Sequence, residues 1–243
     1  MTYSVPVDFV KKAIDAGESK ALMQTQDMLI RAFMAGGILA LAAAFAITIS
    51  VQTGIPLLGA ALFPVGFCML YLMGFDLLTG VFTLVPLAFW DGRQAVTLSA
   101  MLRNWMLVFI GNFAGALTVA LMMAVVLTFG FSVEPNTVGL KIGSIGVDRT
   151  LGYASHGMNG MLTLFVRAVL CNWMVSTAVV TAFMSSSVGG KVIMMWMPIM
   201  IFFYMGFEHS VVNMFLFPAA LMLGGDFSVR DYLVWNEFPT IFG

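Results

Sequence analysis

Charged side chains are scarce in this sequence. Only 9% of the 243 residues are Asp, Glu, Lys or Arg, whereas 60% are hydrophobic. The stretches 32–75, 104–133 and 168–190 contain no charged residue. A helix needs about 20 apolar residues to cross the hydrocarbon core of a bilayer, so each stretch is long enough for at least one crossing. The composition therefore excludes an ordinary soluble domain and predicts an integral membrane protein.

Residues that hold metals, disulfides or cofactors are equally few. The two cysteines, Cys68 and Cys171, lie in apolar stretches, and the two histidines, His156 and His209, are far apart. This spacing gives no recognisable metal site, and the Gly-Gly pairs lack the strand-to-helix context of a phosphate-binding loop. The net charge of −1 provides no basic surface for nucleic acid. We therefore expect no cofactor, no metal, no nucleic-acid partner and no enzyme activity, and we expect His156, in a polar loop, to be exposed.

The apolar stretches divide into five predicted spans, and a sixth begins near the C-terminus. Residues 1–28 are mixed in charge, lack the apolar core of a signal peptide and predict a short amphipathic helix. Counting Lys and Arg on alternate sides puts seven with the N-terminus and four opposite. The positive-inside rule then predicts a cytoplasmic N-terminus for a multi-pass protein of the cell (inner or plasma) membrane. The predicted spans are 29–51, 57–90, 104–130, 158–184 and 192–224.

The second and fifth spans are too long for a simple crossing, and each carries an acidic residue near its middle. Asp76 ends the segment Met-Gly-Phe-Asp, and Glu208 ends Met-Gly-Phe-Glu, at an offset of 132 residues (208 − 76). An ionisable residue at membrane depth is costly and normally lines a pathway or a protein interior. We therefore predict that both helices are broken at these points and that the breaks form the functional site.

The same offset aligns three predicted helices with three others. Three is an odd number of crossings, so the second copy enters from the opposite side and the repeat is inverted. Such repeats place the substrate site near the midplane, where the N-termini of half-helices can face an anion. Within one membrane domain, 1–243, repeat 1 covers 29–130 and repeat 2 covers 158–243. The offset pairs Gly111 with Gly243, so we expect repeat 2 to be incomplete, with the last of six helices largely absent from this chain.

His209 is the predicted centre of the site because it follows Glu208 at the fifth-span break. Moving a bare carboxylate-sized ion into a low-dielectric interior has an idealised cost of order 20 kcal/mol. His209, Thr79, Asn172 and Asn213 supply hydrogen-bonding groups that can replace water around an anion. Proton transfer from an imidazolium also turns a weak-acid anion into a neutral molecule. The residues themselves thus favour a pathway for a small anion.

Four segments together resemble the formate/nitrite transporter family. The resemblance extends over nearly the whole chain, and the last of the four is a specific signature of the family. It implies an all-α, aquaporin-like protomer of six transmembrane helices with its own pore, assembled as a homopentamer and passing formate, nitrite, hydrosulfide or similar anions. The segments are GFDLLTG (74–80), NWMLVFIGNFAGAL (104–117), CNWMV (171–175) and GFEHSVVNM (206–214).

The resemblance also implies roles for individual residues. His209 matches the central pore histidine, Thr79 the threonine that faces it, and Asn172 and Asn213 the asparagines nearby. Lys20 resembles a lysine near the cytoplasmic mouth that attracts anions, although a lone charge at a helix end is equally typical of a solvated interface residue. Without the resemblance, ordinary packing would be the preferred interpretation of the matching apolar residues. The outer constriction corresponds to Phe63, Val175 and Phe202, and the inner one to Phe67, Leu77 and Leu78.

Substrate choice stays open between small anions. Formate is the leading expectation, but Leu77-Leu78 replaces a Leu-Phe pair that formate-type members often have, and the Cys-Asn-Trp segment at 171–173 resembles nitrite-type members. Nitrite and hydrosulfide are therefore alternatives. Two other classes are an aquaporin-like pore for neutral solutes, which the lack of paired Asn-Pro-Ala motifs disfavours, and a non-conducting scaffold. The expected partners are the anion, membrane lipid and further copies of the chain.

Overall fold

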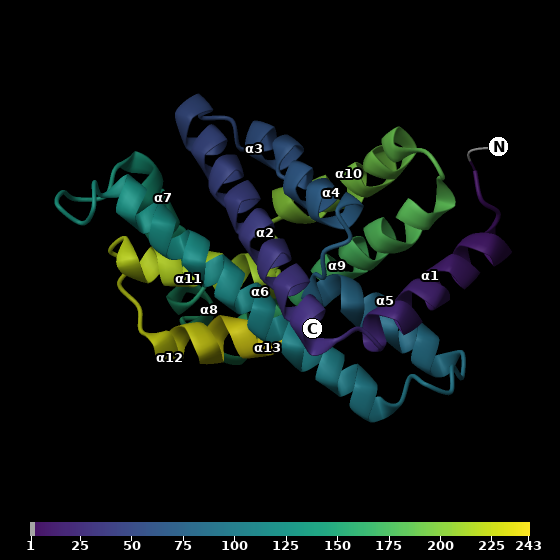
Figure 1. Ribbon diagram of the computed structural model, residues 1–243. Helices are drawn as coiled ribbons and strands as arrows, with labels where there is room; N and C mark the ends of the chain where they lie inside the picture. The colour runs from purple at the N-terminus through teal and green to yellow at the C-terminus, as the bar shows by residue number, and fades with distance from the viewer. Residues whose placement is uncertain (1–2) are drawn as a thin grey trace.

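The computed structural model describes residues 3–243, and all regular secondary structure in that range is helical (Figure 1). Three helices are long and apolar enough to cross a membrane: α2 (Thr25–Thr53), α6 (Leu98–Leu127) and α9 (Gly157–Thr181), which a 3-10 turn, η1, extends to Met184. They correspond to the first, third and fourth predicted spans, although α2 and α6 begin earlier than predicted. The all-helical membrane fold is confirmed.

Helices α2 and α6 cross in close contact at the centre of the molecule (Figure 1). Glycine makes this approach possible. A Cβ atom added to Gly36 would lie 2.1 Å from the carbonyl oxygen of Asn112, and one added to Gly115 would lie 2.0 Å from that of Phe33. Small residues let helix backbones touch in membranes, where packing rather than water exclusion drives association. Gly36 therefore serves close helix packing, as the sequence predicted for the Gly-Gly pairs.

Both long predicted spans are broken. The second consists of α3 (Pro56–Leu62), α4 (Pro64–Leu72) and α5 (Leu78–Trp90). The fifth consists of α10 (Val188–Tyr204) and α11 (Ser210–Met222). Helices α5 and α11 contain 13 residues each, start 132 residues apart (210 − 78) and carry an internal proline at the same place, Pro86 and Pro218. The predicted breaks and the predicted offset are confirmed.

The two breaks also share their backbone geometry. Gly74 and Gly206 adopt positive φ angles of 75° and 66°. In each break the N–H after the glycine donates to the carbonyl five residues earlier, at 2.9 Å in the first and 3.1 Å in the second. This is the hydrogen-bond pattern of a Schellman motif, which ends a helix at a left-handed residue and favours glycine there. Met-Gly-Phe followed by an acid is thus a helix stop, repeated once.

Within the predicted N-terminal segment 1–28, the structure has one helix, α1 (Pro6–Ala21), before α2 begins; residues 1 and 2 lie outside the described part. Helix α1 packs on α5, and Gly17 is so close to the backbone of α5 that an added Cβ would clash at 2.0 Å. Arg93, after α5, binds Asp15 at 2.6 Å and Glu18 at 3.1 Å on α1. Its hydrogen bond with Asp91, assisted by these two carboxylates, raises the pKa of Arg93. Helix α1 is therefore fastened to its own chain.

Two helices between α6 and α9 were not predicted: α7 (Thr137–Asp148) and the single turn α8 (Leu151–Ala154). Helix α7 packs against α11 and is capped by Asn136, whose side-chain oxygen accepts the N–H groups of Val138 and Gly139 at 3.1 and 3.0 Å. Its glycines and its short length hide the helical pattern in the sequence. These two helices supply several residues of the candidate site described below.

The sixth helix is formed by α12 (Val229–Tyr232), a π-helical turn η2 (Leu233–Glu237) and α13 (Phe238–Phe242). An added Cβ on Gly243 would approach Phe165 O and Val169 N, whereas one on Gly115 would approach Phe33 O and Gly37 N. Those neighbours are 132 residues apart in both cases (165 − 33, 169 − 37). By packing, Gly243 is therefore equivalent to Gly115, one helical turn beyond the Gly111 that the constant offset predicted.

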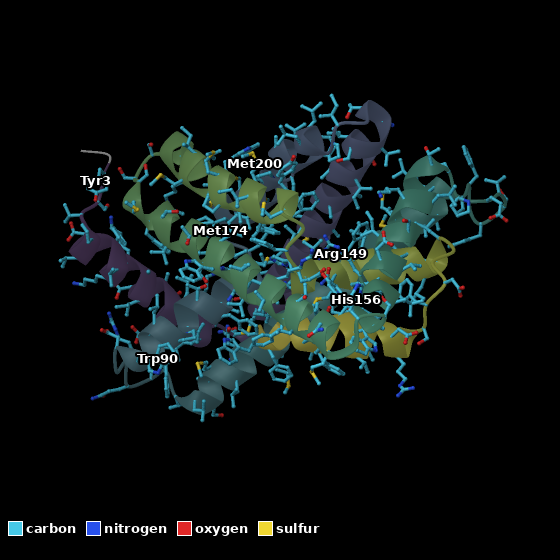
Figure 2. All side chains as sticks on the ribbon, turned by 180° about the vertical axis from the view of Figure 1, so that it is seen from behind. Tyr3, Trp90, Arg149, His156, Met174 and Met200 are labelled. Atoms are coloured by element: carbon cyan, nitrogen blue, oxygen red, sulfur yellow. The ribbon has the colours of Figure 1, made fainter. Side chains whose placement is uncertain are left out.

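Large apolar side chains cover the outward faces of the long helices (Figure 2). Phe45 on α2, Met122 on α6 and Trp173 on α9 are 46%, 62% and 66% exposed. Water would not favour so much exposed apolar surface, whereas lipid or neighbouring protomers would cover it. In the same figure Arg149 and His156 lie near each other, far from Tyr3 and Trp90. Polar groups thus gather at particular ends of the bundle.

Candidate functional site

The two helix breaks meet at His209 and Thr79. His209 caps the N-terminus of α11, and Thr79 lies in the first turn of α5; both side chains are buried. The Nδ1 atom of His209 accepts the backbone N–H of Val212 at 3.3 Å, so the ring proton of a neutral imidazole lies on Nε2. Nε2 is 3.3 Å from the Thr79 Oγ1 atom, to which it donates. The ring of Phe202 stacks on the imidazole at 5.4 Å and fixes its plane.

Glu208, immediately before His209, is fully buried and held by four side chains. Its Oε1 accepts the phenol of Tyr153 at 2.8 Å, and its Oε2 accepts Asn213 Nδ2 at 3.1 Å, Asn236 Nδ2 at 3.2 Å and Arg149 Nη1 at 3.4 Å. Burial, reinforced by the charge of Glu208, raises the pKa of Tyr153 to about 12, so the phenol stays protonated and donates. These partners come from α8, α11, the sixth helix and the residue after α7. They satisfy a carboxylate that would otherwise be costly to bury.

Asp76, at the other break, is paired with Lys20 at the end of α1. The Asp76 side chain is fully buried, and that of Lys20 is 20% exposed. Asn112 on α6 bridges the same break: its Oδ1 accepts the N–H of Leu78 at 2.8 Å, and its Nδ2 donates to the carbonyls of Asp76 and Ala32 at 2.9 and 2.7 Å. Lys20 is therefore an ion-pair partner of the break and is not a free interface residue.

Asn172 on α9 is half-buried, and its buried Oδ1 atom has no hydrogen-bond partner among residues 3–243. Together with Thr79, Glu208 and His209 it lines a small cavity of about 170 Å³. An unpaired buried amide oxygen beside such a cavity can accept a proton donor, such as water or a protonated acid. The structure thus brings all four predicted polar residues (His209, Thr79, Asn172, Asn213) to the meeting point of the breaks.

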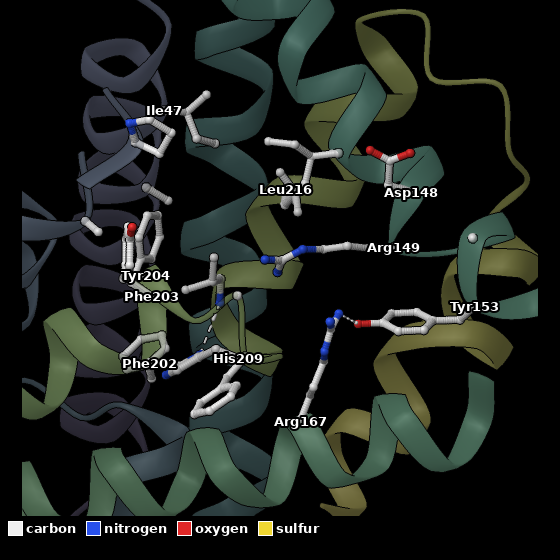
Figure 3. Close-up of a pocket in the computed structure, with 18 of the residues that line it drawn as sticks. Ile47, Asp148, Arg149, Tyr153, Arg167, Phe202, Phe203, Tyr204, His209 and Leu216 are labelled. Carbon is white, nitrogen blue, oxygen red and sulfur yellow. Dashed lines mark hydrogen bonds between the residues drawn. The ribbon is translucent and has the colours of Figure 1, made fainter. Parts of the chain in front are cut away.

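Two larger cavities approach this point. The arginine-side cavity has a volume of about 940 Å³, reaches His209 and Phe202, and is lined by Arg149 and Arg167 (Figure 3). The lysine-side cavity has a volume of about 220 Å³ and is lined by Lys20, Lys191 and mostly apolar residues. Both contain cationic side chains, so both present an environment that attracts anions.

The residues expected at constrictions divide between wall and packing positions. Phe202 lines the arginine-side cavity, and Phe67 and Leu77 line the lysine-side cavity. Phe63 is buried and lines neither; it stacks on Phe203 with ring centroids 3.9 Å apart. Val175 and Leu78 are likewise buried, and neither borders the two cavities. Their roles as constrictions stay predictions.

Several residues of the site were missed by sequence reasoning. Arg149, Tyr153 and Arg167 line the arginine-side cavity, and Asn112 and Asn236 hold the breaks. The arginines entered only as charges in the topology count, because a lone cation near a helix end is common at interfaces. Asn112 carried a usable signal, since an amide in the middle of an apolar helix seeks a buried partner. Within residues 3–243 no three His, Cys, Asp or Glu side chains cluster closely enough to hold a metal.

Comparison with known proteins gives consistent matches along the chain. The family model for the formate/nitrite transporter matches residues 7–243. The probable formate transporter of Methanothermobacter thermautotrophicus is 31% identical, covering 98% of this chain and 88% of the relative. The formate channel BtFdhC of Bacillus thuringiensis is also 31% identical, covering 100% of this chain and 88% of the relative.

Two solved structures share the fold. One, described as a pentameric formate channel with formate bound, has a TM-score of 0.71 at 23% identity and covers 89% of each chain. The other, an FNT family ion channel, has a TM-score of 0.82 at 21% identity and covers 97% of this chain and 94% of its own. The architecture is therefore that of a known class of membrane protein.

Proposed function

Because the chain belongs to the formate/nitrite transporter family, we propose that it passes a small monovalent anion, formate first, past His209 in each protomer of a homopentamer. The observation that carries this proposal is the meeting of the two helix breaks at the His209–Thr79 contact, between two cavities with cationic walls. Relatives that are 31% identical are formate channels or probable formate transporters, which supports formate over other anions. Nitrite is the second candidate and hydrosulfide the third.

The pathway runs from the arginine-side cavity to the lysine-side cavity, through the buried ring of His209. A small anion that enters this region loses water and needs hydrogen-bond donors in its place. The Nε2–H of His209 and the hydroxyl of Thr79 offer two donors, and the N-termini of α5 and α11 add positive partial charge. Phe202 on one side, and Phe67 and Leu77 on the other, exclude water and narrow the route.

His209 also controls the charge of the substrate. An imidazolium has no acceptor nitrogen, so protonation of His209 breaks its bond from the Val212 N–H. The neutral ring is therefore favoured at rest, and a protonated ring readily gives its proton to a weak-acid anion. The neutral acid then crosses the apolar constriction without the cost of a bare charge. Transport coupled to protons follows from this arrangement.

The lysine-side cavity faces the cytoplasm in this proposal. Seven Lys and Arg residues lie on the side of the N-terminus and four on the other, which supports this orientation by the positive-inside rule. The exposed apolar faces of the long helices support burial in lipid and between protomers. A structural neighbour is described as a pentamer, and this supports the same assembly here.

The test is anion uptake into sealed proteoliposomes with an imposed pH gradient. A panel of formate, nitrite and hydrosulfide identifies the preferred anion, and uptake is recorded against pH for the parent and for His209→Asn. We expect His209→Asn to lose the pH response, whereas His156→Asn, which removes the exposed histidine, keeps it. An unchanged pH response in His209→Asn contradicts the role of His209. Swelling in water or glycerol without anion uptake would instead indicate a neutral-solute pore, and no flux of any kind a non-conducting scaffold.

A further inference from the structure

Arg167 is a cation in the middle of an apolar helix that the proposed mechanism does not use. It lies on α9, is half-buried and lines the arginine-side cavity (Figure 3). In the figure its guanidinium points toward that of Arg149 across the cavity. A charged side chain in a membrane-spanning segment is costly, so its presence asks for a compensating interaction.

No carboxylate compensates Arg167 in the described part of the chain. Its Nη1 donates to the phenol oxygen of Tyr153 at 2.7 Å, and no Asp or Glu of residues 3–243 forms an ion pair with it. Arg149, in contrast, is paired with Glu208. The guanidinium of Arg167 has five N–H donors and the phenol takes one, so several remain for the cavity.

The charges around this cavity are unbalanced by one. Lys141, Arg149 and Arg167 are three cations, and Asp148 and Glu208 are two anions, which leaves a formal charge of +1. A single monovalent anion in the cavity makes the region neutral. The charge count thus matches one formate-sized occupant beside Arg167.

A guanidinium is also selective in shape. Its planar fork binds two oxygens of one anion through parallel N–H bonds, which an ammonium group cannot do and a single-atom anion cannot accept. We propose that Arg167 is a specificity-determining contact that selects planar anions with two equivalent oxygens, formate and nitrite, over hydrosulfide before they reach His209. The inference rests on the proposed function, because it concerns the same transported anions.

A purely structural role for Arg167 predicts something different. If Arg167 serves only to hold Tyr153 and, through it, Glu208, then Tyr153→Phe must have the same consequence as changing Arg167, since it removes both bonds of the phenol. If Arg167 supplies only positive charge, then Arg167→Lys must keep the selectivity. The two variants therefore separate the fork from the scaffold and from the charge.

The experiment measures initial uptake of formate and of hydrosulfide at low concentration in proteoliposomes that contain the parent, Arg167→Lys or Tyr153→Phe. We expect Arg167→Lys to lower the formate-to-hydrosulfide ratio roughly tenfold, the effect of losing about one charge-assisted hydrogen bond. We expect Tyr153→Phe to leave the ratio within about twofold of the parent. Equal ratios in parent and Arg167→Lys, or an equal fall in both variants, overturn the assignment while the proposed function stands. Absence of uptake by the parent overturns both.

A measurement on the unmodified protein covers the case in which Arg167→Lys does not assemble. Formate uptake is recorded with equal concentrations of nitrite or of chloride added on the arginine side. Nitrite, with two oxygens in a plane, is expected to inhibit at least several-fold more strongly than chloride. Equal inhibition by the two anions contradicts a fork-shaped site at Arg167.

Discussion

Asn112 offers a quantitative test of how the first helix break is held. Its side chain makes three hydrogen bonds to backbone groups of α2 and of the break, and it is fully buried. Replacement by alanine leaves the N–H of Leu78 and the carbonyls of Asp76 and Ala32 without this partner. Buried interhelical hydrogen bonds in membranes contribute about 0.6 kcal/mol on average and up to about 1.7 kcal/mol. We therefore expect Asn112→Ala to lower the free energy of unfolding by roughly 2–5 kcal/mol.

Asn104, eight residues earlier on the same helix, is a matched control. It is equally buried, but its Nδ2 donates to one backbone carbonyl, that of Lys20 at 3.0 Å, and weakly to Met28 Sδ at 3.6 Å. Its Oδ1 has no partner within residues 3–243, so alanine there also removes an unsatisfied polar atom. The two substitutions delete the same atoms, and their cavity terms largely cancel.

The assay is reversible unfolding by a denaturing detergent in mixed micelles, followed by circular dichroism. Asn112→Ala is expected to cost about 1–3 kcal/mol more than Asn104→Ala, which corresponds to two additional hydrogen bonds. Asn112→Asp should cost still more, because it places a second oxygen against the Asp76 and Ala32 carbonyls while the bond from Leu78 is kept. Equal losses for the two alanine variants would refute the reasoning that these bonds hold the break.

Two further predictions concern the ion pair and the helix crossing. Lys20→Met leaves the Asp76 carboxylate buried without its cation and should cost about 3–5 kcal/mol, whereas Asp76→Asn, which frees the partly exposed Lys20 to reach water, should cost clearly less; equal costs in the same unfolding assay contradict this asymmetry. Gly36→Ala should prevent assembly or strongly lower the melting temperature because its Cβ would lie 2.1 Å from a backbone oxygen of α6, whereas Gly37→Ala, whose nearest neighbour would be 3.7 Å away, should be tolerated; similar melting temperatures for the two variants argue against the crossing described.

The sequence predicted those parts of the fold that repeat. Gly74 and Gly206 stop helices by the same local motif, and a local motif is visible wherever it occurs twice. The offset of 132 residues between the two motifs also relates α5 to α11, which are equivalent helices of the two repeats. It failed at Gly243, which is equivalent by packing to Gly115, because the sixth helix contains a π-helical turn and the repeats differ in length between their helices. An offset carries equivalence only through segments without insertions.

The partners of the acidic residues were beyond sequence reasoning. Glu208 bonds Tyr153, Asn213, Asn236 and Arg149, which come from four different elements as much as 59 residues away. Nothing in the local pattern of those elements points to a carboxylate, since α7 and α8 are short and the asparagine of the sixth helix stands among aromatic residues. Such contacts depend on how helices cross, and packing fixes the crossings.

The distribution of charge over the two breaks explains why acidic residues can stand beside an anion pathway. Asp76 is neutralised by Lys20 from the lysine side, and Glu208 by Arg149 from the arginine side, so neither carboxylate presents a full charge to a passing anion. Each cavity keeps one further cation that forms no ion pair within residues 3–243: Lys191 on one side and Arg167 on the other. Attraction therefore acts from both ends, while the buried centre at His209 stays neutral until a proton arrives.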